Sequence, residues 1–196
     1  MGATSSILKS SIIELNNELR KIGKQINVSE IEDIVTLHAG IGAATAVGAM
    51  LPGAGPVIAS GVAVTSIVTM YVRLSKAMQI KLGEGTLKAI ASAVVADVGS
   101  TVLGSLALSF ALSFIPGIGS VPAAIITGAA NYGVVYLAAV IFIKLLAWLT
   151  KSKKDISSMT SEDFVSATKN ISDSLDKDSA IKEVKKSYKN SQKDKK

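Results

Sequence analysis

Asp97 and His38 are the two ionisable residues that stand inside long apolar stretches and could do chemistry there. Asp97 and Lys144 carry the only formal charges between Lys88 and Lys151. A carboxylate in an apolar helix is an ion site, a proton site or the partner of a buried cation. Alternatively, Asp97 lies about two or three helical turns from Lys88 and can reach water at a membrane interface.

His38 is the single histidine of the chain and lies between Asp33 and Arg73, where no other residue can carry a charge. An imidazole titrates near neutral pH and could pair with a buried acid. The alternative is a hydrogen-bonded residue in the first turns of a membrane helix. We therefore hold Asp97 and His38 as a possible intramembrane polar site.

Enzymatic chemistry has little support in the composition. The chain has no cysteine and one histidine, so common catalytic triads and transition-metal sites lack ligands. The stretch KLGEGTLK lacks the spacing of a phosphate-binding loop. The net charge is +6, but few aromatic residues interleave the lysines as nucleic-acid binding favours. We predict a non-enzymatic protein without cofactor, metal or nucleic-acid partner.

A repeated P-G-x-G pattern organises the long apolar stretches. Proline disfavours helix in the residue before it, and glycine permits the positive φ of a tight reversal. Each copy therefore predicts a turn between two helices. The turn residues are Pro52, Gly53 and Gly55 and, 64 positions later, Pro116, Gly117 and Gly119.

The expected fold is all-α, a membrane protein of two repeated hydrophobic helical hairpins with amphipathic helices at both ends. Hydrophobic residues make up 48% of the chain and charged residues 18%. The apolar runs are too uniform to present a polar stripe to water, so we predict about four membrane helices. The predicted segments are an N-terminal helix (1–28), the first hairpin (29–82), the second hairpin (83–151) and a lysine-rich tail (152–196).

Small residues recur every four positions in the first apolar helix, at Gly40, Ala44 and Gly48, and Gly104 repeats Gly40 in the second hairpin. Such residues let helices approach closely where lipid offers no hydrophobic drive to association. We expect them to pack helices and to favour a homo-oligomer.

The two ends of the chain carry amphipathic patterns. The N-terminal apolar positions alternate steps of four and three, and they are Leu8, Ile12, Leu15, Leu19, Ile22 and Ile26. Ser29 and Glu32 predict a capping box and a helix that begins near Glu30. Thr160 and Asp163 predict a second cap, followed by one face at Phe164, Thr168, Ile171 and Leu175 and a shorter helix at Ile181, Val184 and Tyr188. Lys189 onward is expected to be disordered.

Charge asymmetry predicts the topology. Lysine and arginine cluster in the first 24 residues, in Arg73–Lys88 and from Lys144 onward, while the turns carry no charge. By the positive-inside bias, both termini lie in the cytoplasm, with the bacterial inner membrane as the expected location. The basic flanks favour anionic lipid. The arms of the first hairpin, about 18 residues each, barely cross a bilayer core, so that hairpin either spans the membrane or turns back within it.

One family resemblance covers the span from about Leu37 to Trp148. The stretches TMYVRLSKAMQIKLG (69–83) and FIPGIGSVPAAIITGAANYGVVYLAAV (114–140) resemble the YcjF-like bacterial membrane domain of unknown function. That domain commonly follows an Era-like GTPase domain. The resemblance implies a membrane-embedded helical module that serves a neighbouring activity. This sequence contains no GTPase domain, so a nucleotide-driven role would come from a separate protein.

Three functions follow as hypotheses. The first is an integral membrane module that self-associates and organises the membrane or recruits a partner such as a GTPase or a secretion component. The second is a pore-forming effector or toxin that inserts its uncharged hairpins into a target membrane. The third is a small ion channel, for which Asp97 is the distinctive support.

Overall fold

The protein is all-α over the residues that the computed structural model describes, which are 6–48, 57–112 and 123–193. Both P-G-x-G turns, with Pro52, Gly53, Gly55, Pro116, Gly117 and Gly119, lie outside these residues. The described helices are α1 (Ser6–Arg20), α2 (Val28–Gly48), α3 (Val57–Ala77), α4 (Glu84–Leu112), α5 (Ala123–Ser152), the short 3-10 helix η1 (Ile156–Ser158), α6 (Ser161–Asp173) and α7 (Lys177–Lys193).

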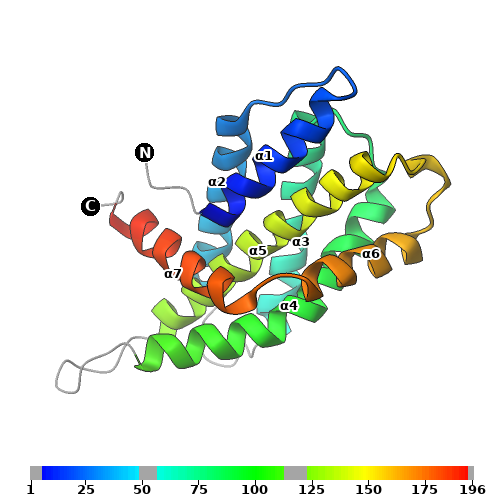
Figure 1. Cartoon of the computed structure of the whole chain (residues 1–196). Helices are drawn as coiled ribbons and strands as arrows, with labels where there is room; N and C mark the ends of the chain where they lie inside the picture. The colour runs from blue at the N-terminus through cyan, green and yellow to red at the C-terminus, as the bar shows by residue number, and fades with distance from the viewer. Residues whose placement is uncertain (1–5, 49–56, 113–122, 194–196) are drawn as a thin grey trace.

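Helix α5 lies at the centre of the bundle and packs against each of the other six α-helices (Figure 1). Between residues 127 and 150, only Thr127, Lys144, Trp148 and Thr150 have side chains that are not fully buried. Its sequence can occupy this position because it is apolar all round, as a helix buried on every face must be. The Tyr71 ring of α3 stacks on Phe142 with 4.0 Å between centroids.

The two expected hairpins are present as helix pairs. Helix α2 packs on α3, and α4 packs on α5. The two pairs differ in burial although their sequences repeat. Helix α5 is enclosed by the other helices, whereas α2 and α3 pack along one side of it. Large apolar side chains of α2 and α3 remain exposed, including Leu37, Ile41 and Val72.

The N-terminal amphipathic helix is confirmed, with one boundary shifted. Leu8, Ile12, Leu15 and Leu19 are buried. Ile22 is exposed because α1 ends at Arg20 and the chain then turns through Gly23, whose φ is +74°.

The start of α2 corrects the expected capping box. The helix begins at Val28, and the Asn27 side chain accepts hydrogen bonds from the backbone N–H groups of Ser29 and Glu30, at 3.1 and 3.3 Å. Asparagine is a strong N-cap, so Asn27 caps the helix and Ser29 lies inside its first turn.

The C-terminal tail matches one expectation and contradicts another. Thr160 and Asp163 form the predicted capping box of α6. Residues Lys189–Lys193 are helical rather than disordered, since α7 continues to Lys193 and is longer than α6. Burial of Ala180, Ile181, Val184 and Tyr188 gives α7 a packed face, which anchors the helix.

Within the described residues, one helix segment, Thr127–Ser152, is long and apolar enough to cross a membrane. The buried core helix of a water-soluble protein meets the same criterion, and this segment is the enclosed part of α5.

Candidate functional site

Most ionisable residues of the four long helices lie toward one end of the bundle. They lie in the first two turns of α2 and α4 and in the last turns of α3 and α5, with Lys144 about two turns before the end of α5. Two ionisable residues lie further along their helices, His38 in the third turn of α2 and Asp97 midway along α4. Antiparallel pairing brings these helix ends together. The Lys24 ammonium, between α1 and α2, donates to the Gln79 carbonyl, between α3 and α4, at 3.1 Å. The opposite end of each hairpin carries no formal charge.

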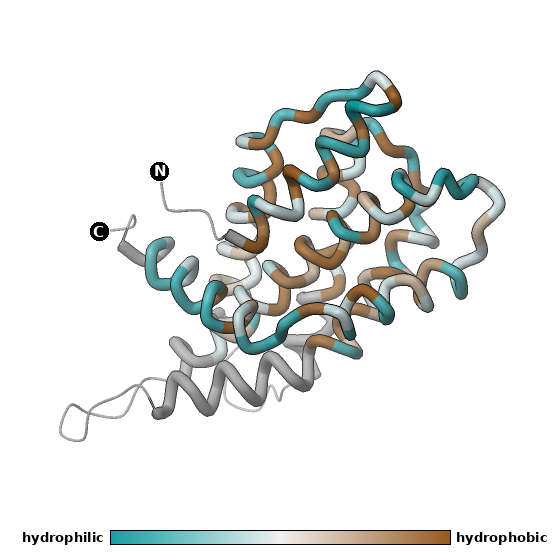
Figure 2. Tube along the Cα trace, viewed as in Figure 1, coloured by the Kyte–Doolittle hydropathy of each residue, from teal (hydrophilic) through white to brown (hydrophobic). Residues whose placement is uncertain are grey.

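Three amphipathic helices, α1, α6 and α7, cover α5 and α4. Figure 2 shows hydrophilic residues on these helices around the more hydrophobic α5. Polar contacts as well as apolar faces attach each cover helix to the hairpins. We take as the candidate site the buried apolar helix α5 together with its contacts to the three helices that cover it, which we call the cover helices.

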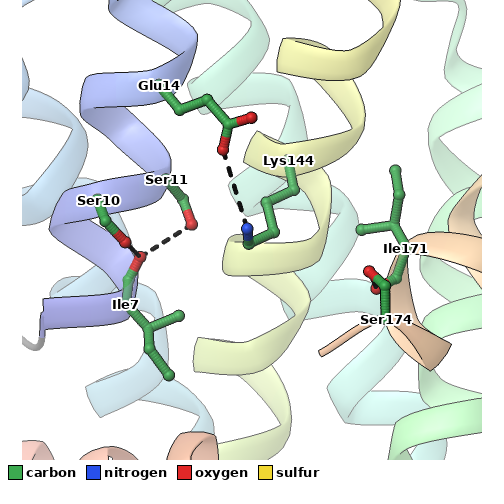
Figure 3. Close-up of polar contacts among 7 residues, drawn as sticks. All are labelled: Ile7, Ser10, Ser11, Glu14, Lys144, Ile171 and Ser174. Atoms are coloured by element: carbon green, nitrogen blue, oxygen red, sulfur yellow. Dashed lines mark hydrogen bonds and ion pairs between the residues drawn. The ribbon is translucent and has the colours of Figure 1, made fainter. Parts of the chain in front are cut away.

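Helix α1 is attached to α5 by an ion pair at its surface. Glu14 of α1 and Lys144 of α5 point toward one another with 3.9 Å between Oε2 and Nζ (Figure 3). The Ser10 and Ser11 hydroxyls donate to the Ile7 carbonyl within the same helix. At this separation and exposure, the ion pair contributes less than about 1 kcal/mol to stability. The buried leucine and isoleucine face therefore holds α1 in place.

Helix α6 is attached to α4 through Asp97. The Ser172 hydroxyl donates a hydrogen bond to Asp97 Oδ2, and Ser172 is buried. The hydroxyl partly replaces the water that a carboxylate loses in an apolar surrounding. Asp97 therefore has a neutral partner from a cover helix, and no ion pair joins it to His38 in the described part of the chain.

Helix α7 crosses α5 near the start of the apolar helix (Figure 1). Tyr132 of α5 lies 2.7 Å from the Ser187 hydroxyl, oxygen to oxygen, and its ring centroid lies 5.4 Å from that of Tyr188. Burial raises the pKa of Tyr132. A carboxylate oxygen of Glu183 accepts the Ile7 N–H at 2.9 Å, which ties α7 to the start of α1.

His38 lies beside a cation rather than an acid. The Arg73 Nη1 group lies 3.3 Å from His38 Nε2, and the His38 side chain is buried. Arginine can only donate, so Nε2 accepts and the imidazole is neutral. Burial lowers the pKa of His38, Arg73 lowers it further, and the Ser66 carbonyl opposes both effects.

A close approach of α2 to α5 uses a glycine outside the expected small-residue set. A Cβ at Gly42 would meet Val135 Cγ2 at 2.9 Å, whereas a Cβ at Gly40 would meet nothing within 4 Å. Ala44 is exposed. Gly40 and Ala44 therefore do not form the tight contact with α5, and the surroundings of Gly48 and Gly104 lie outside the described side chains. That the expected small residues pack against a second copy of the chain stays a prediction.

Sequence reasoning missed Ser172, Tyr132 and Gly42. Ser172 follows Phe164 and Thr168 at steps of four, a signal that it shares their buried face. Tyr132 and Gly42 stand in apolar runs without distinguishing spacing, and only the crossing of neighbouring helices gives them contacts. Among the described residues, no group of three or more His, Asp or Glu side chains could hold a metal ion.

No protein-family model, curated protein or solved structure matches this chain.

Proposed function

We propose that the chain is a non-enzymatic membrane protein whose two uncharged hairpin tips enter the bilayer from the cytoplasmic side. The charged end, with α1, α6 and α7, stays outside the hydrocarbon, where it organises the membrane or recruits a partner such as a separate GTPase. The observation that supports this proposal is that Asp, Glu, Lys and Arg are absent from the far part of both hairpins, beyond Asp33 in the first and beyond Asp97 in the second.

The separation of charge matches the cost of burying it in lipid. From Val98 to Ile143 the sequence has no Asp, Glu, Lys or Arg, and from Ile34 to Val72 only His38 can carry a charge. A charge at the bilayer centre costs at least about 2.5 to 3.5 kcal/mol. A tip-first orientation places none there.

The position of α7 limits how deep the second hairpin can reach in this arrangement. Beyond Tyr132, where α7 touches α5, only Ala123–Asn131 of the helix remain. These residues span roughly 14 Å at 1.5 Å per residue. The hydrocarbon core is about 30 Å thick, so the hairpin enters one leaflet and turns back, unless α7 moves away.

Carbonate extraction tests membrane attachment. Washed membranes should retain the full chain, and recovery mainly in the soluble fraction would overturn the proposal.

The depth of the hairpin tip in the bilayer is measured with single introduced cysteines, because the natural chain has none. An environment-sensitive fluorophore at Ser120→Cys should be shielded from aqueous quencher in vesicles. The same fluorophore at Ser10→Cys on α1 is the matched control and should be quenched.

A second candidate is pore formation, and the enclosure of α5 favours it. The segment long enough to span a membrane is covered by α1 and α7. A protein that travels through water before it inserts needs such a cover. Purified protein should then release dye from loaded vesicles. Retention of the dye at both acidic and neutral pH would reject this candidate without affecting the first.

A further inference from the structure

Helix α7 has two faces of opposite character. Ala180, Ile181, Val184 and Tyr188 form its buried face. Lys182, Lys186 and Lys189 are exposed. Their spacing of four and then three residues places them in one row on the opposite side of the helix.

Acidic residues lie near only one end of this lysine row, where Asp176 and the exposed Asp178 precede Lys182. None of the three side chains forms an ion pair in the described part of the chain, where the ion pairs involve Lys21, Lys88 and Lys144 instead. Helix α7 contains six lysines and only two acidic residues, Asp178 and Glu183. Glu183 is directed to the Ile7 N–H on α1. The outer face of α7 therefore carries an excess of positive charge, most of all at Lys186 and Lys189.

The row lies close to the part of the molecule without charge. Helix α7 crosses α5 at Tyr132, and Figure 1 shows the end of α4 and the start of α5 extending beyond α7. A flexible four-carbon stem lets each lysine ammonium reach several ångströms from the helix. If the uncharged tips insert into a membrane, these ammonium groups are therefore expected to lie at the level of its surface.

Resting on the function proposed above, we propose that Lys182, Lys186 and Lys189 bind the anionic phospholipid headgroups of the leaflet that the hairpin tips enter. Charge complementarity favours this partner, because anionic headgroups attract basic residues near the surface. Nucleic acid fits less well, since the aromatic residue of α7, Tyr188, is buried against Tyr132 and cannot stack on bases.

The test compares vesicle binding by the full chain and two triple variants. The probes are vesicles of phosphatidylcholine alone and vesicles with about one third phosphatidylglycerol, which supply the anionic charge. The first variant is Lys182→Gln, Lys186→Gln and Lys189→Gln. The matched control removes the same charge elsewhere, from exposed lysines on α1, the α3–α4 connection and α6: Lys9→Gln, Lys81→Gln and Lys169→Gln.

The natural chain should bind the anionic vesicles more tightly, and added salt should reduce the difference. The α7 variant should lose about fivefold in this preference per lysine, on the order of 100-fold in all. The control variant should keep most of the preference. Circular dichroism should show the natural helix content in both variants, because all six positions are exposed.

An unchanged preference in the α7 variant, or an equal loss in both variants, would overturn the lipid proposal. A duplex RNA probe tests the competing partner, nucleic acid. If the α7 variant loses RNA binding but binds vesicles like the natural chain, the lipid proposal is also overturned. Binding of neutral vesicles reports tip insertion separately. If the natural chain fails to bind neutral vesicles and carbonate-washed membranes, the proposed function fails, whatever the lysines do.

Discussion

At the residue scale, the polar groups in the apolar helices are matched to local partners rather than to one another. His38 accepts from Arg73, and Asp97 accepts from Ser172. Each partner comes from a different helix, so the contact depends on how helices pack. The pair expected to form one polar site therefore takes part in two separate helix contacts, and a role in proton or ion movement stays a prediction.

His38 should make the protein less stable in mild acid. Its folded-state pKa is lowered by burial and by Arg73, so below about pH 6.5 the unfolded chain binds a proton that the folded chain resists. The free energy of unfolding should fall as pH decreases through that value, by about 1.4 kcal/mol for each unit of pKa difference. Thermal unfolding at a series of pH values measures the effect.

The variant His38→Gln should show a smaller loss between pH 7.5 and 5.5 than the natural chain. The control Thr36→Gln, at an exposed position on the same helix, should follow the natural chain. An identical pH dependence in all three proteins would contradict the assignment.

Gly42 should tolerate a methyl group poorly, whereas Gly40 should tolerate it well. The added Cβ at Gly42 would lie 2.9 Å from Val135 Cγ2, and at Gly40 it would meet open space. Gly42→Ala should cost about 1 to 2 kcal/mol of stability. Gly40→Ala should be neutral or stabilise by up to about 1 kcal/mol through helix propensity. Urea unfolding of both variants provides the comparison.

A double-mutant cycle identifies the cause. If the clash with Val135 is responsible, Val135→Ala should remove part of the cost of Gly42→Ala. Additive effects of the two substitutions would argue against this contact.

At the element scale, the cover helices depend on buried faces, with polar contacts that fix their positions. Helix α6 illustrates this, because Thr160 and Asp163 start it and Phe164, Ala167 and Thr168 bury one face. Ser172 extends that face to Asp97 of α4. By contrast, Glu14 and Lys144 lie 3.9 Å apart at the surface, a geometry that adds little.

Loss of the Ser172 hydroxyl should loosen α6. Ser172→Ala leaves the Asp97 carboxylate without this donor, and we expect a cost of about 1 to 3 kcal/mol in the free energy of unfolding. Ser174→Ala is the matched control, because Ser174 caps the end of α6 and its exposed hydroxyl donates to the Ile171 carbonyl of that helix rather than to another helix. Hydrogen exchange should rise in α6 for the first variant alone. Equal protection of α6 in both variants would refute the prediction.

At the scale of the whole molecule, the most apolar helix is also the most enclosed one. Helix α5 packs against all six other described α-helices. Burial of apolar surface stabilises the fold by about 25 cal/mol per Å², and α5 contributes buried apolar side chains along most of its length. Membrane spanning by α5 would require part of this cover to be exchanged for lipid, and α7 is the cover nearest to the tip.

Removal of α7 should therefore let the second hairpin cross a bilayer. In vesicles that contain an impermeant maleimide, Ser120→Cys of the full chain should stay unlabelled from inside. A chain that ends at Asp176 should become labelled, because Tyr132 and the helix beyond it lose the α7 cover. Ser10→Cys should remain unlabelled in both. Labelling of the full chain, or no labelling of the shortened one, would show that α7 does not set the depth.

The sequence alone determined the helical class, the hairpin pairing and the cap at Thr160. These depend on local physics, since apolar runs, period and capping side chains act within a few residues along the chain. The apolar positions of α1 and α7 were predictable for the same reason. The helical state of Lys189–Lys193 was not, because the anchor at Tyr188 acts only through contact with Tyr132.

Only the tertiary structure decided that α5, rather than the equivalent helix α3 of the first hairpin, lies at the centre. The repeat gives both hairpins similar local patterns, and the choice follows from which helix has no polar face to leave in water. Helix packing also determines that Gly42 rather than Gly40 lies close to α5 and that Asp97 accepts a hydrogen bond from Ser172. These outcomes depend on distances between segments far apart in the sequence, and a local pattern carries no information about such distances.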